Sequence, residues 1–447
     1  MTTKFKNLFL YSFLSFVLSS DLLALEYIYA LDAGYTDSSN LNQRSGGIAG
    51  QANEVGIALN VSNSNQKEWD LNLSGRFSYV DYSDAELNNE ELSDLEGIAL
   101  YQSSTSNFSL ASLARLSEAP TNRFQSAEVN NLRNENVFAI QPNYFFKINS
   151  ANKINMLITF VDYNLEDVEN SPINTGSSSE DKSFLINYVN QINSTNSISL
   201  NARNGEVDFE KSIGQGAIDY DRKDYFFRWV VAGQANQLQV ELGQSHVTDA
   251  SFNEYQLDHK QLSYTRQINR TQSFDIIYSD GFNNPLRNNL ATNTITVNQQ
   301  NNNIARAQKV EERLFNYNIN GDNLTTSLNY YHQTRDVLSV DNTEEQKGYS
   351  FNLVYRLSRV LDNSGMSSIR LSYGKSESEF DGLSANVLSN EVESYSVGYN
   401  YVYSSKLTFS LFYSVRDSLQ IPTSGIETSN ISKSTFFTVT YSDRGKL

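Results

Sequence analysis

The sequence predicts an all-β fold, a transmembrane antiparallel up-and-down β-barrel of about 20 strands, with about 18 as the alternative count. Three observations support this prediction. Long segments alternate apolar and polar residues, short polar turns alternate with longer connections, and the N-terminus has the pattern of a secretion signal. Together these features are typical of barrels that cross a bacterial outer membrane.

The hairpin from Asn136 to Asp167 shows the pattern most clearly. In its first arm Phe138, Ile140 and Tyr144 occupy alternate positions, and successive side chains of a strand point to opposite faces. The turn Asn149–Asn152 leads into a second alternating arm. Each arm has about a dozen residues, more than the roughly 9–11 that a tilted transmembrane strand needs.

Short polar turns and longer, often acidic connections alternate along the chain, as periplasmic turns and extracellular loops do in outer-membrane barrels. The short turns are Asn63–Asn65, Ser103–Ser106, Asn149–Asn152, Asn193–Asn196, Gln234–Asn236, Asn269–Thr271, Asn320–Asn323, Leu361–Gly365 and Ser404–Lys406. The longer connections are Asp81–Glu96, Glu118–Glu135, Glu166–Asp181, Glu210–Asp221, Asn283–Arg306, Asp336–Lys347, Glu377–Asn390 and Asp417–Ser432.

These turns define nine hairpins, and two terminal strands complete the predicted barrel. We expect Glu26–Tyr35 to be the first strand and Ser434–Tyr441 to close against it. The alternation is irregular in Asp94–Gln102 and Lys309–Ile319, which leaves the lower strand count open. A soluble β-sandwich is the competing fold, and long strands, a signal segment and two classes of connection count against it. A solenoid would carry a recurring signature, and only the hairpin pattern recurs here.

The face that meets lipid is predicted from the clearest strands. Leu353, Tyr355 and Leu357 share one parity, and Asn352 and Arg356 lie between them. An open sheet edge cannot be left in hydrocarbon, so such strands must close into a barrel. The apolar parity should therefore face lipid and the polar parity should line the lumen.

The first residues predict export from the cytoplasm. Lys4 and Lys6 precede an apolar run, Leu8–Leu18, which is too short for a membrane-spanning helix. We expect cleavage after Ala24, which divides the chain into a signal peptide, residues 1–24, and one outer-membrane barrel, residues 25–447.

Composition excludes several functions. The chain has no cysteine, which excludes disulfides, a thiol nucleophile and cysteine-ligated metals. A net charge of −17 argues against nucleic-acid binding, which favours basic surfaces. No cofactor and no metal site is predicted, and the dispersed acids of the loops are interpreted mainly as a solvated surface.

The hairpin Phe138-Ala-Ile-Gln-Pro142 with Tyr144-Phe-Phe146, and the opening segment Leu31-Asp-Ala-Gly-Tyr35, resemble outer-membrane β-barrel proteins associated with exopolysaccharide gene clusters. The resemblance is diffuse and covers nearly the whole mature chain. It implies a cell outer-membrane location and a role in surface polysaccharide export or assembly. The end of the chain departs from the usual barrel ending, because Tyr441 is followed by six further residues, Ser-Asp-Arg-Gly-Lys-Leu.

Arginines on the polar parity are the candidate lumen-lining residues: Arg76, Arg203, Arg228, Arg356, Arg370 and Arg416. Arginine rings suit pores that pass anions or phosphate-like groups. The alternative is that they pair with lumen acids, among them Glu54 and Glu241, and brace the wall. His259 should face the lumen, whereas His246 and His332 share the lipid parity near outer strand ends. No catalytic residues are predicted, because no spacing marks a nucleophile and its base.

The sequence thus favours a non-enzymatic barrel that serves as a channel or assembly component for surface exopolysaccharide. The alternative is a diffusion porin for small, anionic nutrients, and an outer-membrane hydrolase is the least favoured function. A TonB-type receptor is not expected, since no plug domain precedes the first strand. Expected partners are outer-membrane lipid and lipopolysaccharide, the polysaccharide itself and periplasmic export components, without nucleic acid.

Overall fold

The protein is described by a computed structural model. It describes residues 25–40, 48–63, 68–84, 87, 89–120, 132–165, 178–209, 218–282, 286–289, 294–297, 307–338, 343–357, 366–381, 387–422 and 427–446. The predicted signal peptide, residues 1–24, lies outside these residues. Among the described residues there is no helix with the length and apolar character needed to cross a membrane.

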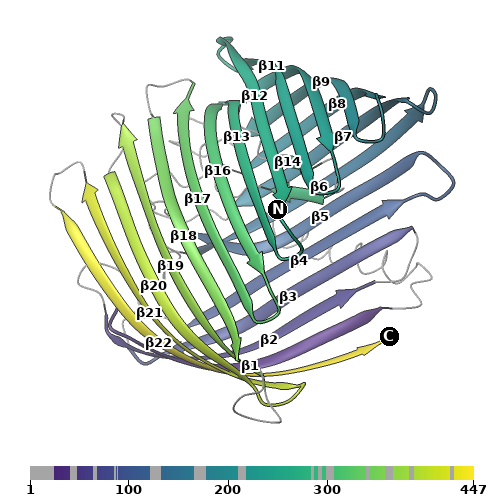
Figure 1. Ribbon diagram of the computed structural model, residues 1–447. Coiled ribbons are helices and arrows are strands. Elements are labelled where there is room, and N and C mark those ends of the chain that lie inside the picture. Colours follow the sequence, from purple (N-terminus) through teal and green to yellow (C-terminus); the bar gives the residue numbers. More distant parts are fainter. Residues whose placement is uncertain are drawn as a thin grey trace, which may run out of the picture.

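Twenty antiparallel strands form one sheet that closes on itself, because β1 pairs with both β2 and β22 (Figure 1). The predicted count of 20 is confirmed. The strands are β1 (Glu26–Ser38), β2 (Gly50–Ser62), β3 (Trp69–Tyr82), β4 (Glu90–Gln102), β5 (Phe108–Pro120), β6 (Leu132–Lys147), β7 (Asn152–Leu165), β8 (Ser179–Gln191), β9 (Asn196–Phe209), β10 (Tyr220–Ala232), β11 (Asn236–Asp249), β12 (Glu254–Gln267), β13 (Gln272–Phe282), β16 (Gln308–Asn320), β17 (Leu324–Val337), β18 (Thr343–Leu357), β19 (Met366–Asp381), β20 (Val387–Val402), β21 (Leu407–Pro422) and β22 (Thr428–Lys446). A small hairpin, β14 (Leu286–Asn289) with β15 (Thr294–Val297), lies in the β13–β16 connection, and β15 approaches β5.

Asparagine side chains build several of the short turns. Asn149 Oδ1 accepts hydrogen bonds from the backbone N–H groups of Ala151 and Asn152, both at 2.9 Å. Asn193 and Asn269 accept the equivalent bonds in the turns before β9 and β13. This geometry satisfies backbone donors that a two-stranded ladder leaves open at its end, which explains why asparagine begins these turns.

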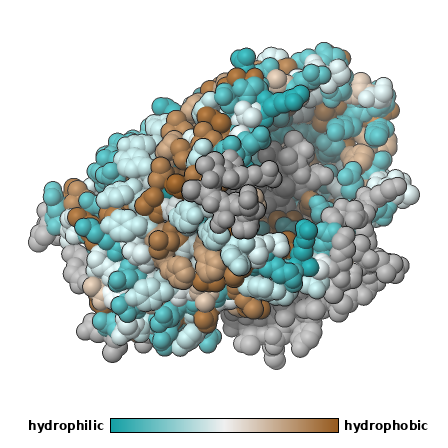
Figure 2. All heavy atoms as spheres, turned by 60° about the horizontal axis from the view of Figure 1, so that its bottom comes forward, coloured by the Kyte–Doolittle hydropathy of each residue, from teal (hydrophilic) through white to brown (hydrophobic). Residues whose placement is uncertain are grey.

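The predicted sidedness agrees with the exposure of the strands. Large apolar side chains are exposed on one parity, for example Val55, Ile57 and Leu59 on β2, and Ile57 pairs with Leu31 on β1 and with Phe77 on β3. Figure 2 shows hydrophobic residues gathered across the middle of this face, with hydrophilic residues towards its margins. The apolar parity thus forms one outer band around the closed wall, as a transmembrane barrel requires.

The strands are longer than the apolar pattern suggests. The acidic connection predicted from Asp81 to Glu96 is mostly strand, since β4 begins at Glu90 and includes Asp94. The last strand continues past Tyr441, which pairs with Leu31, to Lys446. Apolar residues mark only the lipid-covered part of a strand, whereas the ladder continues into headgroups and water.

Candidate functional site: the inner wall of the barrel

The inner face has two chemically different regions. Buried charged and amide side chains gather on β8 to β12, and a smaller group of them on β16 to β18 includes Arg335 and Glu344, which are 3.5 Å apart. Hydroxyl groups dominate the short-turn half of β17 and β18 and the inner parity of β19 to β22. Both regions lie on the parity opposite the exposed apolar band, so both face the lumen. We call the region on β8 to β12 the charged cluster and the hydroxyl-rich region that extends to β22 the hydroxyl wall.

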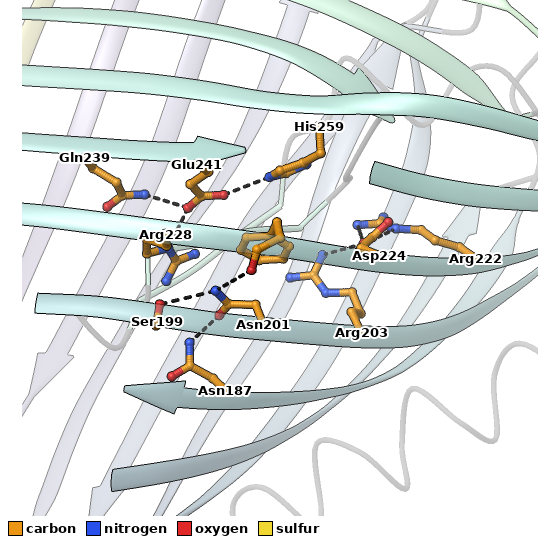
Figure 3. Close-up of polar contacts among 11 residues, drawn as sticks. Asn187, Ser199, Asn201, Arg203, Arg222, Asp224, Arg228, Gln239, Glu241 and His259 are labelled. Carbon is orange, nitrogen blue, oxygen red and sulfur yellow. Dashed lines mark hydrogen bonds and ion pairs between the residues drawn. The ribbon is translucent and has the colours of Figure 1, made fainter. Parts of the chain in front are cut away.

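Glu241 is the centre of the charged cluster (Figure 3). It is only 3% exposed, and its carboxylate accepts hydrogen bonds from Arg228 at 2.6 Å and Gln239 at 2.8 Å. His259 Nε2 lies 2.9 Å from its other oxygen. A buried carboxylate is stable only when its lone pairs are occupied, and three partners from β10, β11 and β12 achieve this.

Nearer the long connections, two arginines of the cluster contact the carboxylate of Asp224. Arg222 approaches Asp224 Oδ2 with Nη2 at 2.6 Å, and Arg203 Nη1 lies 3.8 Å from the same oxygen (Figure 3). All three side chains are at least 88% buried, with exposures of 9%, 2% and 12%. Asp181 on β8 interacts electrostatically with both arginines, so two carboxylates balance two guanidinium groups here, which is how buried ions are normally accommodated.

A row of amides continues the cluster across β8 and β9. Asn187 Nδ2 donates to Asn201 Oδ1, and Asn201 Nδ2 donates to Ser199 Oγ at 3.2 Å. The ring centroid of Phe226 lies 4.6 Å from that of His259, and the Arg228 guanidinium lies 5.6 Å from the Phe226 centroid. These contacts join four strands into one cross-braced part of the wall.

The hydroxyl wall contains mainly serine, threonine and asparagine. Its residues are Ser327, Asn329, Ser350, Asn352, Ser372, Ser376, Ser394, Ser396, Asn400, Thr408, Ser410, Ser414, Ser434, Thr438 and Thr440. Neighbours bond across strands, as with Ser372 and Ser396 at 2.6 Å. On β19 to β22, no carboxylate of the described residues lies on the inner parity. This wall therefore offers neutral donors and acceptors together with a few cationic groups.

Two phenyl rings interrupt the hydroxyl wall. Phe412 on β21 pairs with Phe436 on β22 and with Gly398 on β20. The ring of Phe412 lies over Gly398, which has no side chain to exclude it. Phe436 is 37% exposed. Two adjacent rings on an otherwise polar inner wall form an apolar platform that the sequence alternation alone did not single out.

The six candidate arginines occupy different environments. Arg76 Nη2 lies 2.8 Å from both Asp32 and Glu54, while Arg203 and Arg228 belong to the charged cluster. Arg356 donates to the backbone carbonyl of Asp322 at 3.0 Å.

Arg370 is exposed on β19, one strand from Arg356, and Arg416 lies on β21. Arg356 is close to the short-turn end of its strand, whereas Arg76 lies mid-strand, so the six do not form a ring at one level.

Two of the three histidines bond to carboxylates. His259 contacts Glu241 inside the lumen, and His332 Nε2 lies 2.9 Å from Glu345 on the outer face. Within the described part of the chain, no serine hydroxyl is hydrogen-bonded to a histidine, and no group of His, Asp and Glu side chains has the arrangement of a metal site.

No protein-family model matches the sequence, and no curated protein matches it. Similar solved structures include the siderophore receptor PirA from Pseudomonas aeruginosa, with 12% identity over 93% of this chain and 80% of that chain and a TM-score of 0.43. A variant of the ferric enterobactin receptor PfeA from Pseudomonas aeruginosa has 9% identity over 93% and 80% of the chains, with a TM-score of 0.48. The FrpB iron transporter from Neisseria meningitidis has 9% identity over 93% and 81%, with a TM-score of 0.43.

Proposed function

We propose that this barrel lies in the outer membrane of a Gram-negative cell and serves as a passage or assembly component for a surface exopolysaccharide. The observation that carries the proposal is the pair of rings, Phe412 and Phe436, set in the hydroxyl wall. Aromatic faces contact the apolar C–H faces of sugar rings, while hydroxyl and amide groups exchange hydrogen bonds with sugar hydroxyls.

The distribution of charge supports the same assignment. The lumen side of β19 to β22 lacks carboxylates among its described residues, so a polymer that carries acidic sugars would not be repelled there. In the charged cluster on β8 to β12, cationic and anionic side chains are paired with one another. These charges therefore create only a weak electrostatic field in the lumen. The resemblance to barrels of exopolysaccharide gene clusters is consistent with such a polymer.

Planar-bilayer recordings test the proposal, with an uncharged linear gluco-oligosaccharide as the probe. The wild-type channel should show concentration-dependent current block, and the double variant Phe412→Ala, Phe436→Ala should lose at least tenfold in block affinity. Phe145→Ala is the matched control, because Phe145 is on the inner parity of β6, outside the hydroxyl wall. No block by the probe in the wild type, or equal block in all three proteins, would reject sugar contact by the platform.

The same platform can be tested in cells. Deletion of the gene should lower the amount of polysaccharide at the cell surface, and the wild-type gene should restore it where the double phenylalanine variant does not. Fractionation of the mature chain with the outer membrane, with heat-modifiable gel mobility, tests the location. Recovery as a soluble periplasmic protein would contradict it.

A diffusion porin for small anions is the second candidate, and two arginines favour it. Arg356 and Arg370 are exposed on the inner parity near the short-turn ends of neighbouring strands, and neither forms an ion pair with a carboxylate of the described residues. Such groups would attract anions entering from that side. Replacing both by glutamine should lower anion-over-cation permeability in bilayers if this function holds, and it should leave oligosaccharide block unchanged.

A further inference from the structure

The connection between β13 and β16 is anchored on the inner wall at both of its described ends. Phe282, the last residue of β13, shares the outer parity with Ile276, which is 39% exposed, but is itself only 8% exposed. Its ring centroid lies 5.3 Å from that of Tyr220 on β10, and the Arg222 guanidinium lies 4.9 Å from the Phe282 centroid. Ala307, just before β16, belongs to the same buried apolar cluster as Tyr220. Because Tyr220 and Arg222 are on the inner parity of β10, the chain turns into the lumen where it leaves β13 and where it enters β16.

The hairpin of β14 and β15 in this connection reaches a distant part of the wall. β15 is paired with β14 in a sheet of their own, and it also contacts β5. β5 is the eighth strand from β13 in a closed sheet of 20, so a segment that leaves β13 and arrives at β5 has passed from one side of the barrel to the other. Figure 1 shows β14 within the ring of strands. The hairpin therefore lies across the lumen.

The inner face of β5, β6 and β7 is apolar and buried. Its side chains include Leu113, Val137 and Ala139, which are 5%, 3% and 0% exposed. This is unusual for a transmembrane barrel, whose inner parity is normally polar and in contact with water. On the inner parity of β20, by contrast, Ser394 of the hydroxyl wall is exposed. One side of the lumen is thus covered, and it is the side that β15 contacts.

We propose that the β14–β15 hairpin is an internal partition of the barrel, which docks on the apolar inner patch of β5 to β7 and confines passage to the side of the hydroxyl wall. Removal of this patch from water favours the docked position. The sequence of β15, Thr294-Ile295-Thr296-Val297, consists of β-branched residues, which favour an extended segment on an apolar surface. The inference rests on the barrel fold and not on polysaccharide transport. Its tests use no sugar, so the two proposals fail separately.

Cross-linking between introduced cysteines tests the docked position, and the chain has no native cysteine that would interfere. A short bismaleimide should join Ile295→Cys to Leu113→Cys in the full chain in membranes, which changes the mobility of the unfolded protein on a gel. Ile295→Cys with Ser394→Cys is the matched control and should remain unlinked, because Ser394 is on the hydroxyl wall. Failure to link the first pair, or equal linking of both pairs, would overturn the proposal.

Thiol labelling and conductance test the partition itself. A charged, water-soluble thiol reagent should label Ser394→Cys in the full chain and leave Leu113→Cys unlabelled, a comparison that needs no deletion. When a Gly-Ser linker replaces residues 286–297, Leu113→Cys should become reactive, and single-channel conductance in planar bilayers should rise at least twofold. Equal labelling of the two cysteines in the full chain, or unchanged conductance of the folded linker variant, would show that the hairpin does not divide the lumen.

Discussion

The phenyl ring of Phe412 occupies the space above Gly398, so a methyl group added at position 398 would lie 2.1 Å from the Cδ1 atom of that ring. Carbon atoms cannot approach so closely, which means that the ring must move if any side chain is introduced. Gly398 therefore fixes one half of the proposed sugar-contacting platform.

Gly398→Ala should displace the Phe412 ring and lower the free energy of unfolding by about 1–3 kcal/mol, the usual cost of overpacking. Urea unfolding followed by heat-modifiable gel mobility measures the change. Gly374→Ala, also on the inner parity, is the control, because its nearest neighbour would be Ser394 Oγ at 3.4 Å. Equal losses in the two variants would show that the ring does not lie over Gly398.

Leu353→Arg should destabilise the barrel by about 2–4 kcal/mol if the residue lies near the bilayer midplane, because the charge would enter hydrocarbon. Leu353 is paired with Leu371 and Thr326 on the outward parity. Asn352→Arg, one residue away, should have a far smaller effect since its side chain faces the lumen. The measurement is unfolding in lipid vesicles, and similar effects of the two substitutions would contradict the assigned sidedness.

Arg228→Gln should cost about 3–5 kcal/mol, because it removes the cation from a buried carboxylate. Glu241 is 3% exposed and would keep only Gln239 and His259 as partners. Arg76→Gln should cost about 0–1 kcal/mol, since the Arg76 side chain is 50% exposed and its ion pairs are screened by water. Unfolding midpoints of the two variants provide the test, and the reverse order would rule out the brace at Glu241.

Asn149→Ala should lower stability by about 1 kcal/mol, because two backbone N–H groups would lose their acceptor. Ser150→Ala in the same turn is the control and should be nearly neutral. Refolding yield into detergent and the urea midpoint would detect the difference. Should Asn149→Ala match the wild type, water must replace the side-chain acceptor at no cost.

The local elements of the fold could be predicted because their signals are local. Alternation at residues such as Phe351, Leu353 and Tyr355 reports which face meets lipid, since side chains of a strand alternate between its two faces. The asparagine turns are equally local, because Asn149 bonds only to the next few residues. The predicted strands are shorter than the observed ones, as in β4, which begins at Glu90. Polar residues beyond the lipid zone give no alternating apolar signal, so the sequence does not mark these ends.

The sequence by itself determined the class of fold, the alternation of short and long connections and the parity that faces lipid, and it left the strand number open between 20 and 18. Only the tertiary structure decided which inner side chains meet. Arg228 and Glu241 are paired by the register of β10 and β11, and Phe412, Phe436 and Gly398 come from three strands. The physical reason is that alternation specifies a face, whereas cross-strand register and barrel closure specify neighbours.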